Sequence, residues 1–193
     1  MTEKTLVLIK PDAVKRGLVG EFIARFEKAS LKIIGFKMVQ ADRQLAGKHY
    51  PTTKEWLLKV GRNTLSDCKK YGIDVCESLG TDNPLEIGQM VEGWNKEFLM
   101  SGPVIVLVLA GDHAIENVRM IVGSTIPTIA LPGTIRGDYA LDSAISANAR
   151  KRAVYNLIHA SGSKDEAERE ITLWFKKGEL FSYTRLEEYL YGE

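Results

Sequence analysis

Several features that mark other classes of protein are missing from this 193-residue chain. No apolar run approaches the roughly 20 residues that a membrane-spanning helix needs, so no membrane partner is expected. The first residues lead from a short apolar stretch directly into Lys10 and Pro11, which is unlike a cleavable signal. The formal net charge is only +1, so the chain has no overall field to attract nucleic acid. An anionic ligand would therefore have to be held by local positive charge.

Cysteine is scarce as well. Cys68 and Cys76 are the only two, and they lack the two further ligands of a usual zinc site, so no metal ligand is assigned. They could pair, but two lone thiols fit a reducing compartment better, and we expect a cytoplasmic protein. Repeats and low-complexity tracts are absent too. The length suits one well-buried domain, which we expect to span residues 1–193.

Apolar patterning predicts four strands and three main helices. The expected strands are dense apolar or β-branched runs, at residues 4–10, 32–41, 104–109 and 156–161. The run at 104–109, "VIVLVL", is continuous, which indicates burial on both faces of the sheet. Helical spacing of apolar residues, with capping and stop signals, predicts helices over 18–31, 112–124 and 163–175. Asp112 is the expected N-cap and Gly123 the expected stop of the second helix.

This order of elements, β-α-β followed by β-α-β, predicts an α/β (α+β) protein with a ferredoxin-like βαββαβ fold. The expected core is an antiparallel four-stranded sheet with helices packed over one face. Residues 51–99 are polar with scattered Trp and Leu, and they are expected to form a helical excursion between core elements. Residues 139–152 are rich in alanine and are expected to form a smaller helical insertion.

Four basic side chains stand at the ends of elements or in a loop between them. Lys10 closes the first strand, and Arg119 lies one turn beyond Ile115 in the second helix. Arg136 lies in "LPGTIRGD", where glycines allow the backbone to approach a ligand closely. His159 closes the last strand. One lysine, two arginines and one histidine in a nearly neutral chain suit a polyphosphate, with the histidine as the reactive group.

The last helix supplies a partner for this histidine. Ala167, Ile171 and Trp174 mark its buried face, and Glu170 lies on or beside that face. A buried carboxylate needs a partner, and an imidazole N–H at the end of the neighbouring strand is a suitable one. Such a hydrogen bond would fix the tautomer of His159 and leave its other nitrogen free to attack.

Each of these residues also has an ordinary structural interpretation. A single histidine at a strand end is usually structural or merely exposed. Lys-Pro-Asp is commonly a turn, and Arg119 could be a helix residue whose charge reaches solvent. Glu170 could pair with a solvated lysine. No single residue decides the function.

Together, these residues closely resemble the nucleoside diphosphate kinase family. The resemblance rests on "TLVLIKPDAVKRGLVGEFIARFEKASLKIIGFK", "SGPVIVLVL", "VGSTIPTIALPGTIRGD", "NLIHASGS" and "AEREITLWF". It covers nearly everything outside 51–99 and 139–152. The resemblance implies ping-pong transfer of a γ-phosphate from a nucleoside triphosphate to a diphosphate through a phosphohistidine.

The resemblance also implies roles for individual residues. His159 would be the nucleophile, oriented by Ser161 and Glu170. Contacts to the nucleotide's sugar and phosphates would come from Lys10, Tyr50, Arg119, Thr125, Arg136 and Asn156. Mg²⁺ would arrive bound to the nucleotide phosphates, and the protein is expected to be a homo-oligomer.

The chain departs from the family pattern at three places. Gly162 stands where the family usually has an aspartate, which bears on the surroundings of Mg²⁺. The segment 51–99 replaces the hairpin that supplies base-stacking residues, whose nominal counterparts here are Val91 and Asn95, with Trp94 as another candidate. The extra residues at 139–152 fall in a loop associated with subunit contacts.

Two rival functions remain to be weighed. A non-catalytic nucleotide-binding regulatory module would have no need of His159, Glu170 and Arg119 together. A ferredoxin-like nucleic-acid binder would carry basic and aromatic strand motifs, which the sequence does not show. A nucleotide phosphotransferase is therefore the leading hypothesis.

Overall fold

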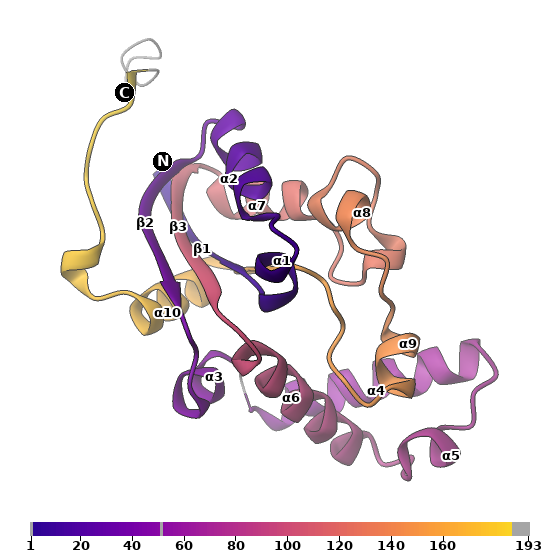
Figure 1. Ribbon diagram of the computed structural model, residues 1–193. Coiled ribbons are helices and arrows are strands. Elements are labelled where there is room, and N and C mark those ends of the chain that lie inside the picture. The colour runs from indigo at the N-terminus through magenta and orange to yellow at the C-terminus, as the bar shows by residue number, and fades with distance from the viewer. Residues whose placement is uncertain (1, 51, 187–193) are drawn as a thin grey trace.

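The sheet is the predicted one. A computed structural model describes residues 2–50 and 52–186 of the chain. Four strands lie in the order β2-β3-β1-β4, and each neighbouring pair is antiparallel. They are β1 (Thr2–Ile9), β2 (Lys32–Val39), β3 (Val104–Asp112) and β4 (Ile158–Ala160). The ferredoxin-like fold class is confirmed (Figure 1).

Ten α-helices and two 3-10 turns complete the described chain. The helices are α1 (Pro11–Lys15), α2 (Val19–Lys28), α3 (Arg43–His49), α4 (Lys54–Lys70), α5 (Val75–Leu79), α6 (Pro84–Met100), α7 (Ala114–Val122), α8 (Ile135–Tyr139), α9 (Ala144–Ala149) and α10 (Lys164–Trp174). The 3-10 turns are Pro127–Ile129 and Lys177–Glu179. Both stretches expected to be helical excursions are helical. Their helices begin at side chains that accept a backbone N–H from the first turn, namely Thr53, Asp74, Asn83 and Ser143.

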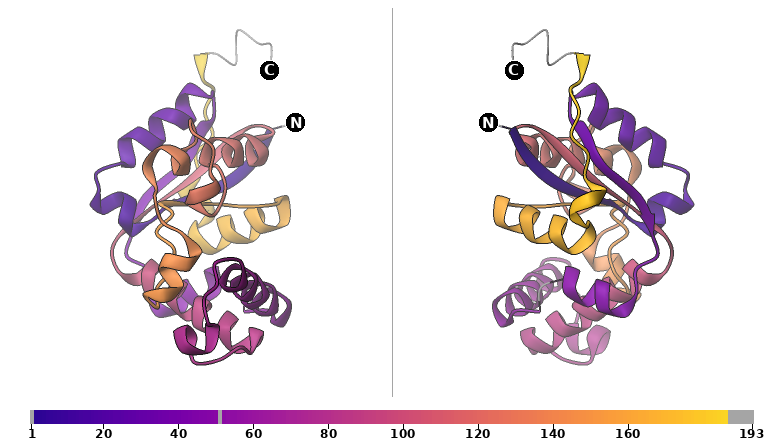
Figure 2. Two further views of the ribbon diagram at one scale, coloured as in Figure 1. Left: turned by 90° about the vertical axis from the view of Figure 1, so that its right-hand side faces the viewer. Right: turned by 90° about the vertical axis from the view of Figure 1, so that its left-hand side faces the viewer.

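Two hydrophobic clusters lie on opposite faces of the sheet. Helices α2 and α7 cover one face, where Phe22, Phe26 and Val118 pack against alternate strand residues. Helices α3 and α10 cover the other, with Ala46 and Trp174 among its buried residues. Figure 2 shows the sheet between these helices. Burial on both faces explains the unbroken apolar run of β3.

Two expectations about these elements were wrong. Helices cover both faces of the sheet, because α3 and α10 occupy the face that the sequence pattern left open. Asp112 is the last residue of β3, where it lies opposite Thr2. The N-cap of α7 is instead His113, which has a left-handed backbone (φ 49°) and makes no side-chain cap. Asp112 thus pairs within the sheet, although its capping preference had predicted that it would begin the helix.

The two insertions gather at one end of the molecule, where α4 and α6 cross and α9 packs against α4 and α5 (Figure 1). The crossing depends on two glycines. A Cβ at Gly61 would lie 1.8 Å from the Pro84 carbonyl oxygen, and one at Gly88 would lie 2.2 Å from the Leu57 carbonyl oxygen. Both contacts are to backbone, which cannot rotate away. The α4–α6 pair therefore packs at a distance that only glycine permits.

We expect Gly61→Ala to destabilise the protein, by about 1–3 kcal/mol or more, because the methyl group must push α6 away from α4. Gly93→Ala is the matched control, since Gly93 lies in α6, the other helix of the pair, and a Cβ there would meet nothing within 4 Å. The control should be neutral or stabilising by up to about 1 kcal/mol, because alanine favours the helix. Thermal and urea unfolding of both variants would check this, and equal stabilities would contradict it.

Two further features are the lack of a membrane-spanning helix among the described residues and the state of the two cysteines. No described helix combines the length and apolarity needed to cross a membrane. Cys68 and Cys76 are both free thiols, the first buried and the second exposed. The disulfide left open by the sequence is therefore not formed.

Candidate functional site

The residues that the sequence singled out meet at one cleft of about 1180 Å³. Its lining includes Lys10, Tyr50, Arg119, Thr125, Arg136, Asn156, His159 and Glu170. Ser161, which is fully buried, lies behind the lining and contacts Glu170. Part of the lining comes from β4, α7 and α10, and another part comes from α4, α6 and α9. The two insertions thus help to build the cleft.

Strand β4 presents His159 to this cleft. His159 lies in the middle of β4, opposite Leu8 of β1, rather than at the strand's end. Just before it, Leu157 has a left-handed backbone with φ 68°, which is strained for a residue with a branched side chain. Two bonds to the start of α1 hold it there: Lys10 N donates to the Leu157 oxygen (2.8 Å), and Leu157 N donates to Asp12 Oδ2 (3.1 Å).

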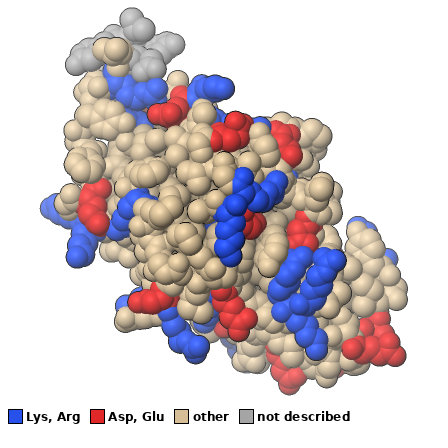
Figure 3. All heavy atoms as spheres, in the orientation of Figure 1, with Lys and Arg blue, Asp and Glu red and all other residues tan. Residues whose placement is uncertain are grey.

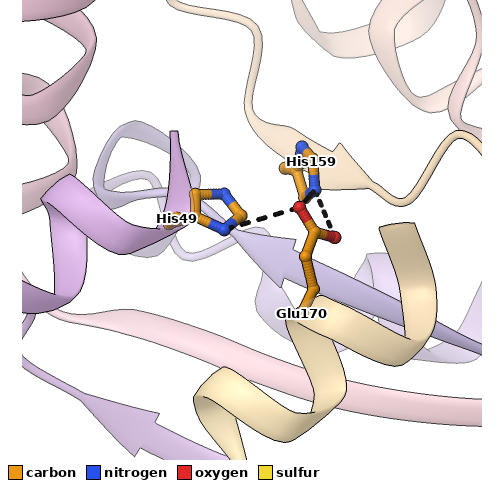
Figure 4. Close-up of side chains that lie close together, drawn as sticks. All are labelled: His49, His159 and Glu170. Atoms are coloured by element: carbon orange, nitrogen blue, oxygen red, sulfur yellow. Dashed lines mark hydrogen bonds and ion pairs between the residues drawn. The ribbon is translucent and has the colours of Figure 1, made fainter. Parts of the chain in front are cut away.

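His159 is held by the predicted carboxylate. Its Nε2 lies 3.0 and 2.9 Å from the two oxygens of Glu170, which is 1% exposed (Figure 4). Ser161 Oγ donates to Glu170 Oε2 at 2.7 Å. A carboxylate accepts hydrogen bonds, so Nε2 carries the proton and Nδ1 carries the lone pair. The arrangement leaves the nucleophilic nitrogen free.

The surroundings favour a neutral imidazole. Burial, followed by the positive charge of Lys10, lowers the pKa of His159. Burial raises the pKa of Glu170, while the His49 ring and the Ser161 hydroxyl oppose that rise. A neutral His159 keeps its Nδ1 lone pair at neutral pH, which a nucleophile requires.

His49 is a part of the site that the sequence analysis missed. It is 2% exposed, and its ring packs edge-to-face on the His159 ring with centroids 4.7 Å apart. Its Nδ1 accepts a hydrogen bond from Trp174 Nε1 (3.3 Å) and lies 3.6 Å from Glu170 Oε1. The available signal was the scarcity of histidine, three in the chain, with one directly before Tyr50.

His49, His159 and Glu170 form the one group of described residues whose nitrogen and oxygen ligand atoms lie close enough, within 4.8 Å, to hold a metal ion. Each of these atoms already takes part in the hydrogen-bond network of the cleft. We therefore assign the group to the orientation of His159 and not to a metal.

Lys10 and Asn156 form a buried pair on the same side of the cleft. Lys10 Nζ donates to Asn156 Oδ1 at 2.7 Å, and Asn156 Nδ2 donates to the Thr125 oxygen at 2.9 Å. Burial, together with the nearby Arg136, lowers the pKa of Lys10 to about 8. Two of the three ammonium protons of Lys10 remain available to a ligand.

The two arginines of the cleft differ in the hydrogen bonds that they make within the protein. Arg136 is 6% exposed and donates to three backbone oxygens, those of Asn156 (3.1 Å), Gly123 (2.8 Å) and Ile158. Burial and the charge of Arg119 lower the pKa of Arg136 to about 10. Arg119 is exposed and makes no hydrogen bond or ion pair within the described chain. Arg119 lines the cleft, so its five N–H donors are available to a ligand there.

The outer cleft is lined by the insertion helices. Val91 and Asn95 of α6 belong to the lining, and so does Trp56 of α4. Trp94, the other candidate for base stacking, does not line the cleft. Its place on α6 turns it from the face that Val91 and Asn95 present, since one residue advances a helix by about 100°.

We expect the pH dependence of stability to reveal His49. Burial lowers its pKa from 6.5 to about 3, so below pH 6.5 the unfolded chain takes up a proton that the folded chain refuses. The unfolded state then binds more protons, and stability falls as the pH falls, by up to about 1.4 kcal/mol per pH unit for one group.

His49→Gln should make this dependence shallower between pH 6.5 and 4.5, because glutamine does not titrate and can still accept from Trp174. Urea unfolding of both proteins across that range measures the difference. The raised pKa of Glu170 acts with the opposite sign, but it is present in both proteins. Identical slopes would contradict burial of a neutral His49.

Comparison with known proteins supplies an independent view of the chain. A family model described as nucleoside diphosphate kinase matches residues 3–57 and 93–180. The nucleoside diphosphate kinase of Pyrobaculum aerophilum is 49% identical over 178 residues, which cover 92% of this chain and 97% of that protein. That of Pyrococcus furiosus is 42% identical over 191 residues, which cover 99% and 94%.

Solved structures are similar as well. A crystal structure of an NDP kinase from Pyrobaculum aerophilum superposes with a TM-score of 0.91 at 47% identity, covering 94% of this chain and all of that one. A transition state mimic of the nucleoside-diphosphate kinase from Borrelia burgdorferi, with bound vanadate and ADP, gives a TM-score of 0.76 at 35% identity. The matched regions cover 97% of this chain and 95% of that one.

Proposed function

Because this chain belongs to the nucleoside diphosphate kinase family, we propose that it transfers the γ-phosphate between nucleotides through a phosphohistidine on His159. Enzymes of this class are phosphotransferases whose substrates are nucleotides. One observation carries the finer proposal. His159 Nε2 faces Glu170 while Nδ1 is left without a proton, at the edge of a cleft lined by Lys10, Arg119 and Arg136.

The reaction divides into two displacements. In the first, the Nδ1 lone pair attacks the γ-phosphorus of a nucleoside triphosphate, the bond from phosphorus to the bridging oxygen breaks, and the diphosphate leaves. In the second, a terminal oxygen of another nucleoside diphosphate attacks the same phosphorus. The nitrogen–phosphorus bond breaks and its electron pair returns to Nδ1. No proton has to leave His159, because Nε2–H stays bonded to Glu170 throughout.

Glu170 and Ser161 orient the nucleophile in this proposal. While the phosphorus is bonded to Nδ1, the imidazole ring becomes positively charged, and the nearby Glu170 carboxylate stabilises that charge. The Ser161 hydroxyl, 2.7 Å from Glu170 Oε2, keeps the carboxylate in place. The His49 ring packs edge-to-face against the His159 ring and so helps to hold it in place.

The cations of the cleft hold the phosphates. Arg119 is free to bind phosphate oxygens with its whole guanidinium group, and Arg136 retains two N–H groups beyond its three backbone bonds. In this proposal Thr125 also holds the phosphates, and Tyr50 approaches the phosphate near His159. Lys10 and Asn156 contact the sugar 3′-hydroxyl and the transferring end of the phosphate chain, and all four residues line the cleft. Such positioning of charge around an in-line acceptor is the main requirement of phosphoryl transfer.

Enzymes of this family generally use a divalent cation, and we propose Mg²⁺ bound mainly through the nucleotide phosphates. Magnesium keeps several waters and takes one or two carboxylates in addition to phosphate oxygens. Asp165 and Glu166, in the first turn of α10, line the cleft beside Gly162. Glu166 Oε2 accepts from Gly162 N at 2.8 Å, which leaves its other oxygen available. These carboxylates fit a hydrated, nucleotide-bound ion, which would spread the charge of the phosphates.

We also propose that residues 1–193 form one domain that assembles into a homo-oligomer. The edge strand β2 exposes Phe36 and Met38, which are 50% and 59% exposed, and exposed apolar side chains of this size favour a partner. A cytoplasmic location also stays a prediction, with which the free thiols of Cys68 and Cys76 are consistent.

The regulatory alternative is less well supported. A binding-only module has no use for a buried carboxylate that aligns one nitrogen of a histidine. On the face shown in Figure 3, positive and negative side chains are interspersed, unlike the continuous basic surface expected of a nucleic-acid binder.

Incubation with γ-labelled ATP tests the proposal. The wild-type protein should acquire a label that is stable to alkali and labile to acid, as expected for a phosphorus–nitrogen bond, and His159→Ala should acquire none. The labelled protein should then pass the phosphate to added GDP. The control is His113→Ala, because His113 lies at the N-terminus of α7 and does not line the cleft. Absence of label on the wild type, or equal labelling of His159→Ala, would exclude this mechanism.

A further inference from the structure

The two insertions meet at the outer part of the cleft. Helix α9, from the shorter insertion, packs against α4 and α5 from the longer one. Val60 of α4 and Ala144 of α9 both line the cleft, as does Ala153, which follows α9. This wall combines apolar residues with polar ones such as Asn63 and Thr64, and it is made of segments that lie outside the β-α-β core.

One polar side chain in this wall has an unmet hydrogen-bonding group. Asn148 of α9 lines the cleft and is 7% exposed, and its amide nitrogen Nδ2 is buried with no hydrogen-bond partner in the described chain. Asn156, the other buried asparagine of the lining, differs, because both its Oδ1 and Nδ2 are bonded. A buried, unpaired amide donor is unfavourable, and each instance needs an explanation.

The backbone around Asn148 is fixed, so this is not a fraying helix end. Ser143 caps the start of α9 by accepting from Ser146 N at 3.0 Å. At the other end, Lys151 N donates to the backbone oxygen of Asn148 (2.9 Å), and Arg152 N donates to the backbone oxygen of Ala147 (3.1 Å). Ala147 is fully buried. The amide is thus held in the wall while its nitrogen lacks a partner.

We propose that Asn148 recognises the nucleotide base by a hydrogen bond to the polar edge of the base. The proposal rests on the proposed function, which places the phosphates at Lys10, Arg119, Arg136 and His159. A nucleotide bound there must direct its base toward the rest of the same cleft. An uncharged amide suits a base edge better than a phosphate, for which the cleft already provides cations.

An asparagine amide can serve more than one base. Rotation about its last side-chain bond exchanges oxygen and nitrogen, so the group can donate to a carbonyl oxygen of guanine or accept from the amino group of adenine. Asn148 would therefore add affinity for bases with a polar edge, without imposing strict selection among them. A base of the same shape without polar edge atoms would gain nothing from it.

Calorimetric titration of wild type and Asn148→Leu tests this, with ADP, GDP and an apolar isostere of ADP whose base is 4-methylindole. Leucine has the same branched arrangement of heavy atoms as asparagine but lacks the amide. We expect the variant to lose about tenfold in affinity for ADP and GDP and to bind the isostere as the wild type does. Asn63→Leu is the matched control, because Asn63 also lines the cleft but is exposed. The control should not change the ratio of affinities.

Three results would overturn the proposal: equal losses for all three ligands, no loss for any, or the selective loss in Asn63→Leu instead. Circular dichroism and thermal unfolding confirm that each variant is folded, and Asn148→Ala replaces Asn148→Leu in the same comparison if leucine does not fit. Labelling of the same preparations with γ-labelled ATP reports separately on the phosphohistidine. A labelled protein without base discrimination refutes only the role of Asn148, and discrimination without label refutes only the phosphotransfer.

Discussion

Replacing Glu170 with glutamine is expected to lower turnover by a factor on the order of 100, while the protein still folds and binds nucleotide. In the wild type, the carboxylate lies 2.9 and 3.0 Å from His159 Nε2 and is 1% exposed. The amide can still accept one hydrogen bond, but it carries no charge to stabilise the ring when phosphorus is bonded to Nδ1. Loss of one well-placed electrostatic partner in a buried site has an effect of about this size.

The amount of phosphoenzyme and its rate of formation measure this effect directly. Ser161→Ala is the graded control, because it removes the hydroxyl that bonds Glu170 Oε2 and leaves the carboxylate in place. Its turnover should lie between those of the wild type and Glu170→Gln. Unchanged turnover in Glu170→Gln would show that another group, of which His49 is the nearest, orients His159.

The local sequence patterns correctly predicted those features that depend on a single helix or strand. Helical spacing predicted Glu170 on or beside the buried face of α10, and the apolar run before His159 predicted that the ring stands on a strand. Because β4 pairs with β1 and α10 packs on β1, the two side chains had to meet. The fold class followed from the order of strands and helices for the same reason.

The sequence patterns failed for residues whose positions depend on how distant elements pack together. Nothing local to "KHYP" shows that His49 would lie against His159, since that contact depends on how α3 packs beside α10. The outer cleft was predicted only in part. Val91 and Asn95 were named and line it, but the shape of its wall depends on the α4–α6 crossing at Gly61 and Gly88. Trp94 was proposed for stacking on composition alone, and the rotation of α6 turned it away from the cleft.

Arg136 shows how a residue assigned to ligand binding can also hold the fold together. Its guanidinium reaches three backbone oxygens, on Gly123 at the end of α7, on Asn156 and on Ile158. Gly123 and Asn156 line the cleft at the end where we propose that the phosphates bind, its phosphate end. The sequence marked Arg136 as a phosphate ligand, but three of its five N–H groups serve the protein itself.

Arg136→Met is therefore expected to lower the free energy of unfolding by several kcal/mol, on the order of 3–5, because methionine fills the space and leaves three carbonyl groups without their donor. Arg119→Met is the matched control. Arg119 is exposed and makes no hydrogen bond or ion pair within the described chain, so its replacement should change stability by less than about 0.5 kcal/mol.

Both variants should bind nucleoside diphosphates more weakly, since each loses a cation of the phosphate end. Urea unfolding without nucleotide separates the two roles, because only the structural bonds contribute there. A large loss of stability in Arg136→Met alone would show that this guanidinium stabilises the backbone around the site in addition to binding the ligand. Equal stability of the two variants would mean that the backbone of this loop is held by other contacts, and that Arg136, like Arg119, acts on the ligand only.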